Sequence, residues 1–82
     1  MSNDIRKITH IEKLLIEDAI SAFGTMELQG GSKETKEGKT IYHLCFNNVH
    51  LSTTSPEARK VGRLIKKRLK ADEIWLLGTR IA

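Results

Sequence analysis

Few features of the 82-residue sequence suit a secreted or membrane-spanning protein. Its single cysteine, Cys45, excludes an intrachain disulfide, and this favours a reducing compartment. The longest apolar run, Ile74–Leu77, is much shorter than the roughly 20 residues that a transmembrane helix needs. The opening residues, 1–7, have no apolar core of the kind found in signal peptides. We therefore expect a cytoplasmic protein without a transmembrane segment.

Size and composition predict one small domain, residues 1–82, without a deep cleft. A chain of this length buries about 60–65% of its unfolded surface, so its core is thin. Hydrophobic residues make up 39% and charged residues 29%, which is typical of a folded chain. The pair Gly30-Gly31 lacks the spacing of a nucleotide phosphate loop. We expect no enzymatic activity and no cofactor.

Positive charge is concentrated in the last third of the chain. The formal net charge is +4, but residues 1–51 hold six basic and seven acidic side chains. Residues 52–82 hold eight basic and three acidic side chains, and the segment 56–71 alone holds seven basic and one acidic. The positive field therefore belongs to one segment rather than to the whole surface.

The N-terminal segment predicts a helix with a defined start. Thr9 and Glu12 have the spacing of a capping box, and Gly24 fits a left-handed stop after Phe23. Residues 4–7 fit an additional turn in front of this helix. Apolar residues follow the helical period along it: Ile8, Ile11, Leu15, Ala19 and Phe23, with Leu14, Ile16 and Ile20 beside them.

Strands follow in the middle of the chain. Residues 25–29 alternate as a strand does, and the polar, glycine-bounded segment 30–38 predicts a mobile hairpin tip. Asn47-Asn48 predicts a two-residue turn between strands 39–46 and 49–54. This turn sets a register that pairs, on the core face, Phe46 with Val49, Leu44 with Leu51 and Tyr42 with Thr53. The opposite, exposed face then carries Ile41, His43, Cys45, His50, Ser52 and Thr54.

The last third predicts a helix and a strand. Ser55 and Pro56 are typical of a helix start, and Asp72 is expected to end the helix. The apolar segment 73–79 predicts a central strand. The helix has an apolar stripe that we expect to be buried: Ala58, Val61, Leu64, Ile65 and Leu69. The element order is α-β-β-β-α-β, which predicts an α+β fold: a mostly antiparallel sheet with two helices packed on one face.

The basic helix 56–71 has three interpretations: contact with nucleic acid, contact with acidic protein or lipid headgroups, and a merely solvated face. The element order resembles that of the double-stranded-RNA-binding domain, whose second helix is also basic. That family opens this helix with a lysine cluster, whereas Ser55–Ala58 opens it here. We therefore keep a small nucleic-acid-binding protein as the alternative function. The cations that we expect to contact a partner are Arg59, Lys60, Arg63, Lys66, Lys67 and Lys70.

His43, Cys45 and His50 combine ligand types that zinc prefers, and Cys45 opposite His50 also resembles a nucleophile and its base. A metal site needs a fourth ligand, and a reactive thiol needs an orienting acid; the sequence offers neither close by. We expect no metal and no thiol chemistry. With Ile41, these residues instead form a second expected contact surface on the exposed sheet face.

The broad first helix and the doubly apolar last strand provide more apolar surface than two helices can cover. Exposed patches of this kind mark interfaces. We expect an interface either with a second copy of the chain, as a homodimer, or with a partner protein.

The whole chain resembles the cytoplasmic antiholin of T4-like phages, the lysis-inhibition accessory protein. The resemblance lies in the opening Met1–Lys7, the helix Ile11–Asp18, the strand Ile41–Phe46 and the total length. It implies a non-enzymatic regulatory protein of the host cytoplasm, peripheral to the inner membrane. Such a protein would bind the cytosolic part of the phage holin and delay host lysis.

Overall fold

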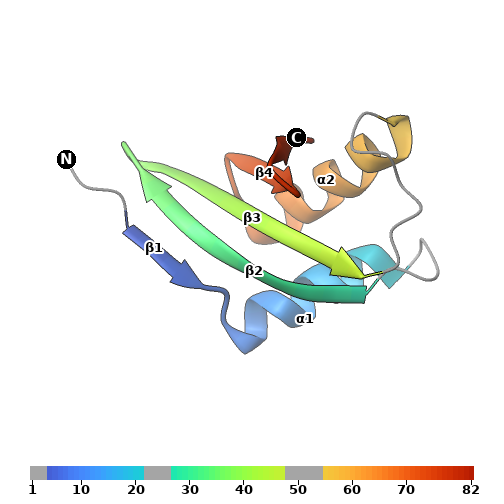
Figure 1. Cartoon of the computed structure of the whole chain (residues 1–82), viewed down its shortest axis with the longest axis horizontal. Helices are drawn as coiled ribbons and strands as arrows, with labels where there is room; N and C mark the ends of the chain where they lie inside the picture. The colour runs from blue at the N-terminus through green and yellow to red at the C-terminus, as the bar shows by residue number, and fades with distance from the viewer. Residues whose placement is uncertain (1–3, 22–26, 48–54) are drawn as a thin grey trace.

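The computed structural model describes residues 4–21, 27–47 and 55–82. Its elements are β1 (Asp4–Lys7), α1 (His10–Ile20), β2 (Glu27–Lys36), β3 (Lys39–Asn47), α2 (Pro56–Leu69), β4 (Glu73–Leu76) and β5 (Thr79–Arg80). The strands form one sheet in the order β1-β2-β3-β4-β5, antiparallel except between β3 and β4. Both helices lie on the same face of this sheet (Figure 1). The predicted α+β class, with a mostly antiparallel sheet and its helices on one face, is confirmed.

The N-terminal half differs from the prediction in two places. Residues 4–7 form an edge strand rather than a helical turn. The segment 30–36 belongs to β2, and the turn to β3 lies at Glu37-Gly38, where both residues have positive φ. The predicted hairpin tip, residues 30–38, was therefore too long, because the turn itself consists of Glu37 and Gly38. Pairing of β2 with a neighbour on each side outweighs the low strand propensity of this polar segment.

The helix starts follow their local signals. Thr9 caps α1 in a reciprocal capping box with Glu12, and Ser55 caps α2 ahead of Pro56, as predicted. The end of α2 was predicted wrongly: Lys70, in the left-handed conformation, ends it before Asp72. Asp72 Oδ2 instead accepts a hydrogen bond from the Thr40 amide at 2.7 Å, and this bond fixes the start of β4 against β3. The predicted stop at Gly24 lies outside the described residues.

The core lies between the sheet and the two helices. Tyr42, Leu44 and Phe46 point into it, as predicted for the core face of β3. Leu64 was predicted to lie in the buried stripe of α2, and this was wrong, because it reaches the surface. Ile11 and Leu14 in the broad apolar stripe of α1 are exposed as well. The other buried members are Ile16, Ala19, Ile20, Leu28, Ala58, Val61, Ile65, Ile74, Leu76 and Ile81.

The surroundings of β3 also differ from the prediction. Over Ile41–Leu44, β3 pairs with β2 on one side and with β4, in parallel, on the other. The expected register of Tyr42 and Leu44 with a following strand is therefore wrong. The predicted strand 49–54 itself lies outside the described residues. The last strand has neighbours on both sides, as expected, but it ends at Leu76, and β5 follows after the turn Leu77-Gly78.

Candidate interaction surfaces

The outward side of α2 carries the cations predicted from the sequence. The opposite side of the helix is buried and consists of Ala58, Val61, Gly62 and Ile65. Of the seven basic residues of the segment, Arg68 reaches across to Asp18 of α1 and forms an ion pair. No ion pair within the described residues involves the remaining six, which we call the cationic face: Arg59, Lys60, Arg63, Lys66, Lys67 and Lys70.

An apolar side chain interrupts the cationic face. Leu64 is 41% exposed, and with Lys60, Arg63 and Lys67 it lines a shallow hollow of about 370 Å³. These four residues follow one another at helical spacing, so they form one stripe on the helix. The arrangement offers a partner one apolar contact next to three cations, which fits an acidic surface that also carries an apolar side chain.

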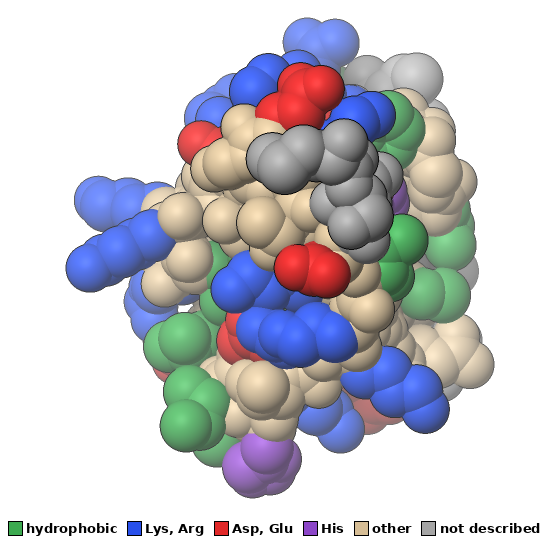
Figure 2. Space-filling view, turned by 90° about the vertical axis from the view of Figure 1, so that its left-hand side faces the viewer, with side chains coloured by type: hydrophobic (Ala, Val, Ile, Leu, Met, Phe, Trp, Pro, Cys, Tyr) green, Lys and Arg blue, Asp and Glu red, His purple; other side chains and the backbone are tan. Residues whose placement is uncertain are grey.

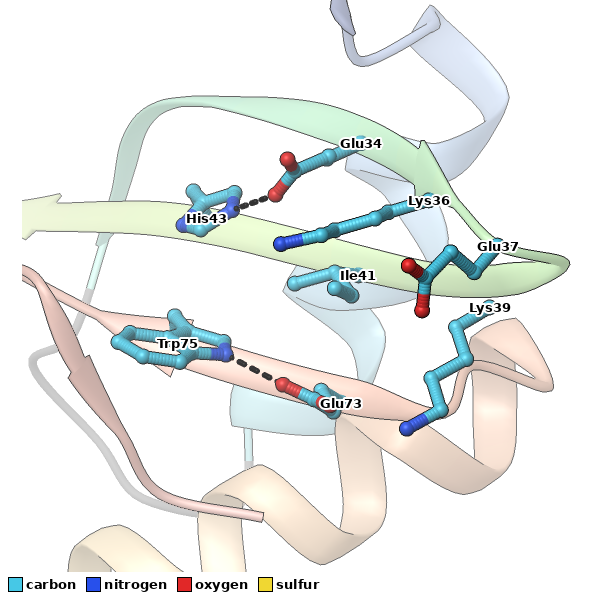
Figure 3. A pocket seen from close by; sticks show the side chains of 8 residues that line it. All are labelled: Glu34, Lys36, Glu37, Lys39, Ile41, His43, Glu73 and Trp75. Atoms are coloured by element: carbon cyan, nitrogen blue, oxygen red, sulfur yellow. Dashed lines mark hydrogen bonds and ion pairs between the residues drawn. The ribbon is translucent and has the colours of Figure 1, made fainter. Parts of the chain in front are cut away.

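The second predicted surface lies on the face of the sheet that the helices leave uncovered. Directly paired residues of neighbouring strands point to the same side of a sheet, so Glu34, Ile41 and Glu73 form one row across it. Ser32, His43 and Trp75 form the next row. We call this surface the open face. Figure 3 shows its hollow of about 380 Å³, lined by Glu34, Lys36, Glu37, Lys39, Ile41, His43, Glu73 and Trp75.

The polar groups of the open face are arranged in two pairs. His43 Nε2 lies 2.9 Å from Glu34 Oε1, and Trp75 Nε1 donates to Glu73 Oε1 at 2.8 Å (Figure 3). The rings of His43 and Trp75 are tilted by 42° with centroids 5.7 Å apart, which joins the two pairs. The hydrogen bond from Trp75 lowers the pKa of Glu73, and Arg80 lies 3.8 Å from the same carboxylate.

Ile41 was expected to be exposed on this face, and this was wrong. It is only 7% exposed, because β4 lies beside β3 and places Trp75 and Glu73 next to it. From the sequence, Trp75 was placed within the apolar last strand, and Glu34 and Glu73 were not identified as members of a surface. Ile74, Trp75 and Leu76 are all apolar, so the sequence carries no signal for the side on which Trp75 lies. In the structure, Ile74 and Leu76 are buried and Trp75, on the other face of the strand, is only partly buried.

Cys45 is half-buried on the open face, and its Sγ donates to Gln29 Oε1 at 3.5 Å. His50, predicted to face it, lies outside the described residues. Within residues 4–21, 27–47 and 55–82, no three His, Cys, Asp or Glu side chains are grouped so that they could hold a metal ion.

The cationic face and the open face do not form one site. The side chains of β3 alternate, so Tyr42, Leu44 and Phe46 point toward the helices while His43 and Cys45 point away from them. α2 packs on the helix side of the sheet (Figure 1). Of the ten residues predicted to contact a partner, His50 lies outside the described residues, and the other nine form two groups on opposite sides of the sheet. Each group must be tested separately.

Figure 2 looks onto the end of the molecule where β1 and the β2–β3 hairpin lie. Lys and Arg side chains are interspersed there with Asp and Glu, and hydrophobic side chains reach the surface. The large hydrophobic residues exposed over the described chain are Ile5, Ile11, Leu14, Leu64 and Leu77.

Among the described helices, none is long and apolar enough to cross a membrane.

Comparison with known proteins gives no relative for this arrangement. No protein family, curated protein or solved structure matches the chain.

Proposed function

We propose that this chain is a non-enzymatic regulatory protein that binds an acidic partner protein through the cationic face of α2. The observation that carries the proposal is the row of six Lys and Arg side chains with no ion-pair partner among the described residues. Like charges three and four positions apart on a helix repel one another, and the helix dipole favours only the cations of the last turn, so the fold gains little from this density. A partner that neutralises it explains the arrangement better than solvation does.

The resemblance to phage antiholins specifies the partner. On that basis the partner is the cytosolic part of a holin at the inner membrane, and binding delays lysis. Anionic lipid beside such a partner would add attraction of about 1 kcal/mol for each cation near the membrane surface.

Leu64 favours a protein over a nucleic acid as the partner. A nucleic-acid surface at this helix would present phosphates, which gain nothing from an exposed leucine between Lys60 and Lys67. Proteins that bind single strands use exposed aromatic rings for stacking. Among the described Phe, Tyr and Trp residues only Trp75 is not buried, and it belongs to the open face. A protein interface uses both the apolar centre and the charged rim.

Two double variants with equal charge change test the cationic face. Lys60→Glu with Lys67→Glu, and Lys13→Glu with Lys36→Glu, each bring the formal net charge from +4 to zero, and all four lysines are exposed. The first pair flanks Leu64, whereas Lys13 lies on α1 and Lys36 lies at the rim of the open face, and neither belongs to the cationic face. We expect the first variant to bind the holin's cytosolic segment at least tenfold more weakly, and the second to change binding by less than threefold. Equal losses in both variants would show that binding depends on net charge and not on this face.

The nucleic-acid alternative is tested with labelled RNA and DNA duplexes at two salt concentrations. If α2 contacts phosphates, each contact adds about 0.7–0.9 to the slope of log affinity against log salt. Submicromolar duplex binding that disappears with salt, and that Lys60→Glu with Lys67→Glu removes, would assign the cationic face to nucleic acid and overturn the proposal. We expect no such binding.

A further inference from the structure

The outer edge of β1 is an open strand edge. β1 is the first strand in the sheet order and pairs with β2 alone among the described residues. All four of its residues are exposed, and Ile5 is 67% exposed on an edge that lacks proline. The free N–H and C=O groups of such an edge template pairing with another strand, and proteins usually oppose this with proline or with charged side chains. β1 has no proline, and its charges are of both signs, Asp4 with Arg6 and Lys7, so a second strand of the same sequence can complement them.

The β1–β2 ladder shows which backbone groups face outward. The Ile8 amide donates to the Gly31 carbonyl at 3.2 Å, in the register that pairs Lys7 with Ser32. Hydrogen-bonded and non-hydrogen-bonded pairs alternate along an antiparallel ladder. The backbone groups of Asp4 and Arg6 therefore face β2, and those of Ile5 and Lys7 face outward. Consistently, the Lys7 carbonyl accepts a hydrogen bond from Arg6 Nη1 at 2.9 Å.

We propose that β1 pairs with β1 of a second copy of this chain, antiparallel, with Ile5 on the two-fold axis. A two-fold axis perpendicular to the sheet joins two antiparallel edge strands into one continuous sheet. The outward N–H and C=O of Ile5 then exchange two hydrogen bonds with the same groups of the second copy. The two Ile5 side chains meet on the open face.

Charge selects this register over the others. With Ile5 on the axis, Asp4 of each copy lies opposite Arg6 of the other, in the closely spaced type of pair where side chains interact most. Asp4 has no ion pair among the described residues, and this contact places it beside Arg6, whose guanidinium also binds Glu12 of its own chain. The other position with outward backbone groups, Lys7, would place two lysines opposite each other on the axis. Axes at Asp4 or Arg6 would oppose like charges and use backbone groups already bonded to β2.

The proposed contact is small, and it is independent of the partner proposed for α2. Four residues on each side bury much less than the roughly 1,200–2,000 Å² of a standard interface, so we expect a dimer of micromolar affinity. The cationic face lies on α2, which contacts β4 and α1 rather than β1, and it stays accessible in the dimer. Failure of one proposal therefore leaves the other standing.

Sedimentation equilibrium of the full chain tests the dimer. We expect a reversible monomer–dimer equilibrium, and we expect Ile5→Lys to weaken it more than tenfold because two lysines then meet on the axis. The matched control is Leu77→Lys, which adds the same charge at a similarly exposed leucine in the β4–β5 turn (60% exposed) and should change nothing. A wild-type chain that stays monomeric, or equal effects of both variants, would overturn the proposal.

A crosslink tests the register. Residues of a hydrogen-bonded antiparallel pair have Cα atoms about 5.5 Å apart, within the range a disulfide spans. Ile5→Cys in a Cys45→Ser background should therefore form a covalent dimer on mild oxidation. Leu77→Cys in the same background should not. A dimer that forms without crosslinking through position 5 would place the interface elsewhere.

Discussion

Tyr42 Oη donates to Glu12 Oε2 at 2.5 Å, which joins the central strand β3 to the first turn of α1. The same carboxylate accepts two hydrogen bonds from the Arg6 guanidinium, at 2.9 and 3.1 Å, and one from the Thr9 amide at 2.7 Å. Glu12 therefore connects β1, the α1 cap and β3. Burial, together with the bond to Glu12, raises the pKa of Tyr42 above its usual range.

This cluster makes stability depend on pH in the acid range. The hydrogen bonds from Arg6, with those from Thr9 and Tyr42, lower the pKa of Glu12 from its ordinary 4.5 to about 2. A carboxylate whose pKa is lowered by folding stabilises the fold above its unfolded pKa, and this contribution is lost as the pH falls through the folded one. We expect about 1–2 kcal/mol to disappear between about pH 5 and pH 2, allowing for screening of the half-exposed Arg6.

Urea unfolding across this pH range measures the effect. Glu12→Gln should be less stable than the wild type at pH 7, and the difference should shrink toward pH 2. The matched control is Glu17→Gln, which removes a carboxylate of the same helix outside this cluster and should cost less stability at pH 7 than Glu12→Gln. A Glu12→Gln variant that follows the wild-type curve in parallel would show that the cluster does not carry the acid dependence.

The sequence patterns that predicted the structure correctly are local ones. The Thr9–Glu12 capping box, the Ser55-Pro56 start and the alternation around Tyr42 each depend on a few neighbouring residues, and the structure confirms them. The errors concern pairing over long distances. A strand of four exposed residues such as β1 has no signature until β2 is beside it, and the burial of Ile41 depends on β4.

The candidate surfaces divide in the same way. The cationic face follows from charge and helical spacing in one continuous segment, so the sequence was sufficient to define it. The open face combines Glu34, His43 and Trp75 from three strands, and only the sheet topology brings them together. Leu64 was assigned to the core because its spacing fits the buried stripe, but the stripe is narrower than expected and Gly62 occupies the buried position beside it.

Two adjacent glycines of β2 should respond differently to alanine. A Cβ at Gly31 would lie 2.8 Å from Leu44 Cδ2 and 2.9 Å from the His43 carbonyl oxygen, whereas a Cβ at Gly30 meets nothing within 4 Å. The backbone oxygen cannot move away without disturbing the β2–β3 ladder. We expect Gly31→Ala to lower the free energy of unfolding by about 1–3 kcal/mol, and Gly30→Ala to change it by less than about 0.5 kcal/mol. Equal effects in urea unfolding would contradict the packing described for Leu44.

The ion pair between Arg68 of α2 and Asp18 of α1 should contribute little despite its position between the helices. Both side chains are about half exposed, at 49% and 61%, and exposed pairs are screened by water and salt. A double-mutant cycle with Arg68→Gln and Asp18→Asn should give a coupling of less than about 1 kcal/mol that decreases with salt. A coupling above about 2 kcal/mol would show that the pair holds the helices together, and that the apolar contacts between them do not suffice.

Substitutions on the cationic face should weaken partner binding without lowering the free energy of unfolding. Lys60→Glu replaces a repulsive neighbour of Arg63 by an attractive one three residues away, so we expect the free energy of unfolding to stay level or to rise by about 0.2–0.5 kcal/mol. Lys67→Glu gains a similar attraction to Arg63 but places an acid in the last turn, where the helix dipole opposes it, and the two effects should nearly cancel. Both single variants should nevertheless weaken partner binding, because both lysines flank Leu64. Thermal unfolding and binding, measured on the same samples, check this. If either variant loses binding only in proportion to a loss of stability, the cations serve the helix itself and not a partner.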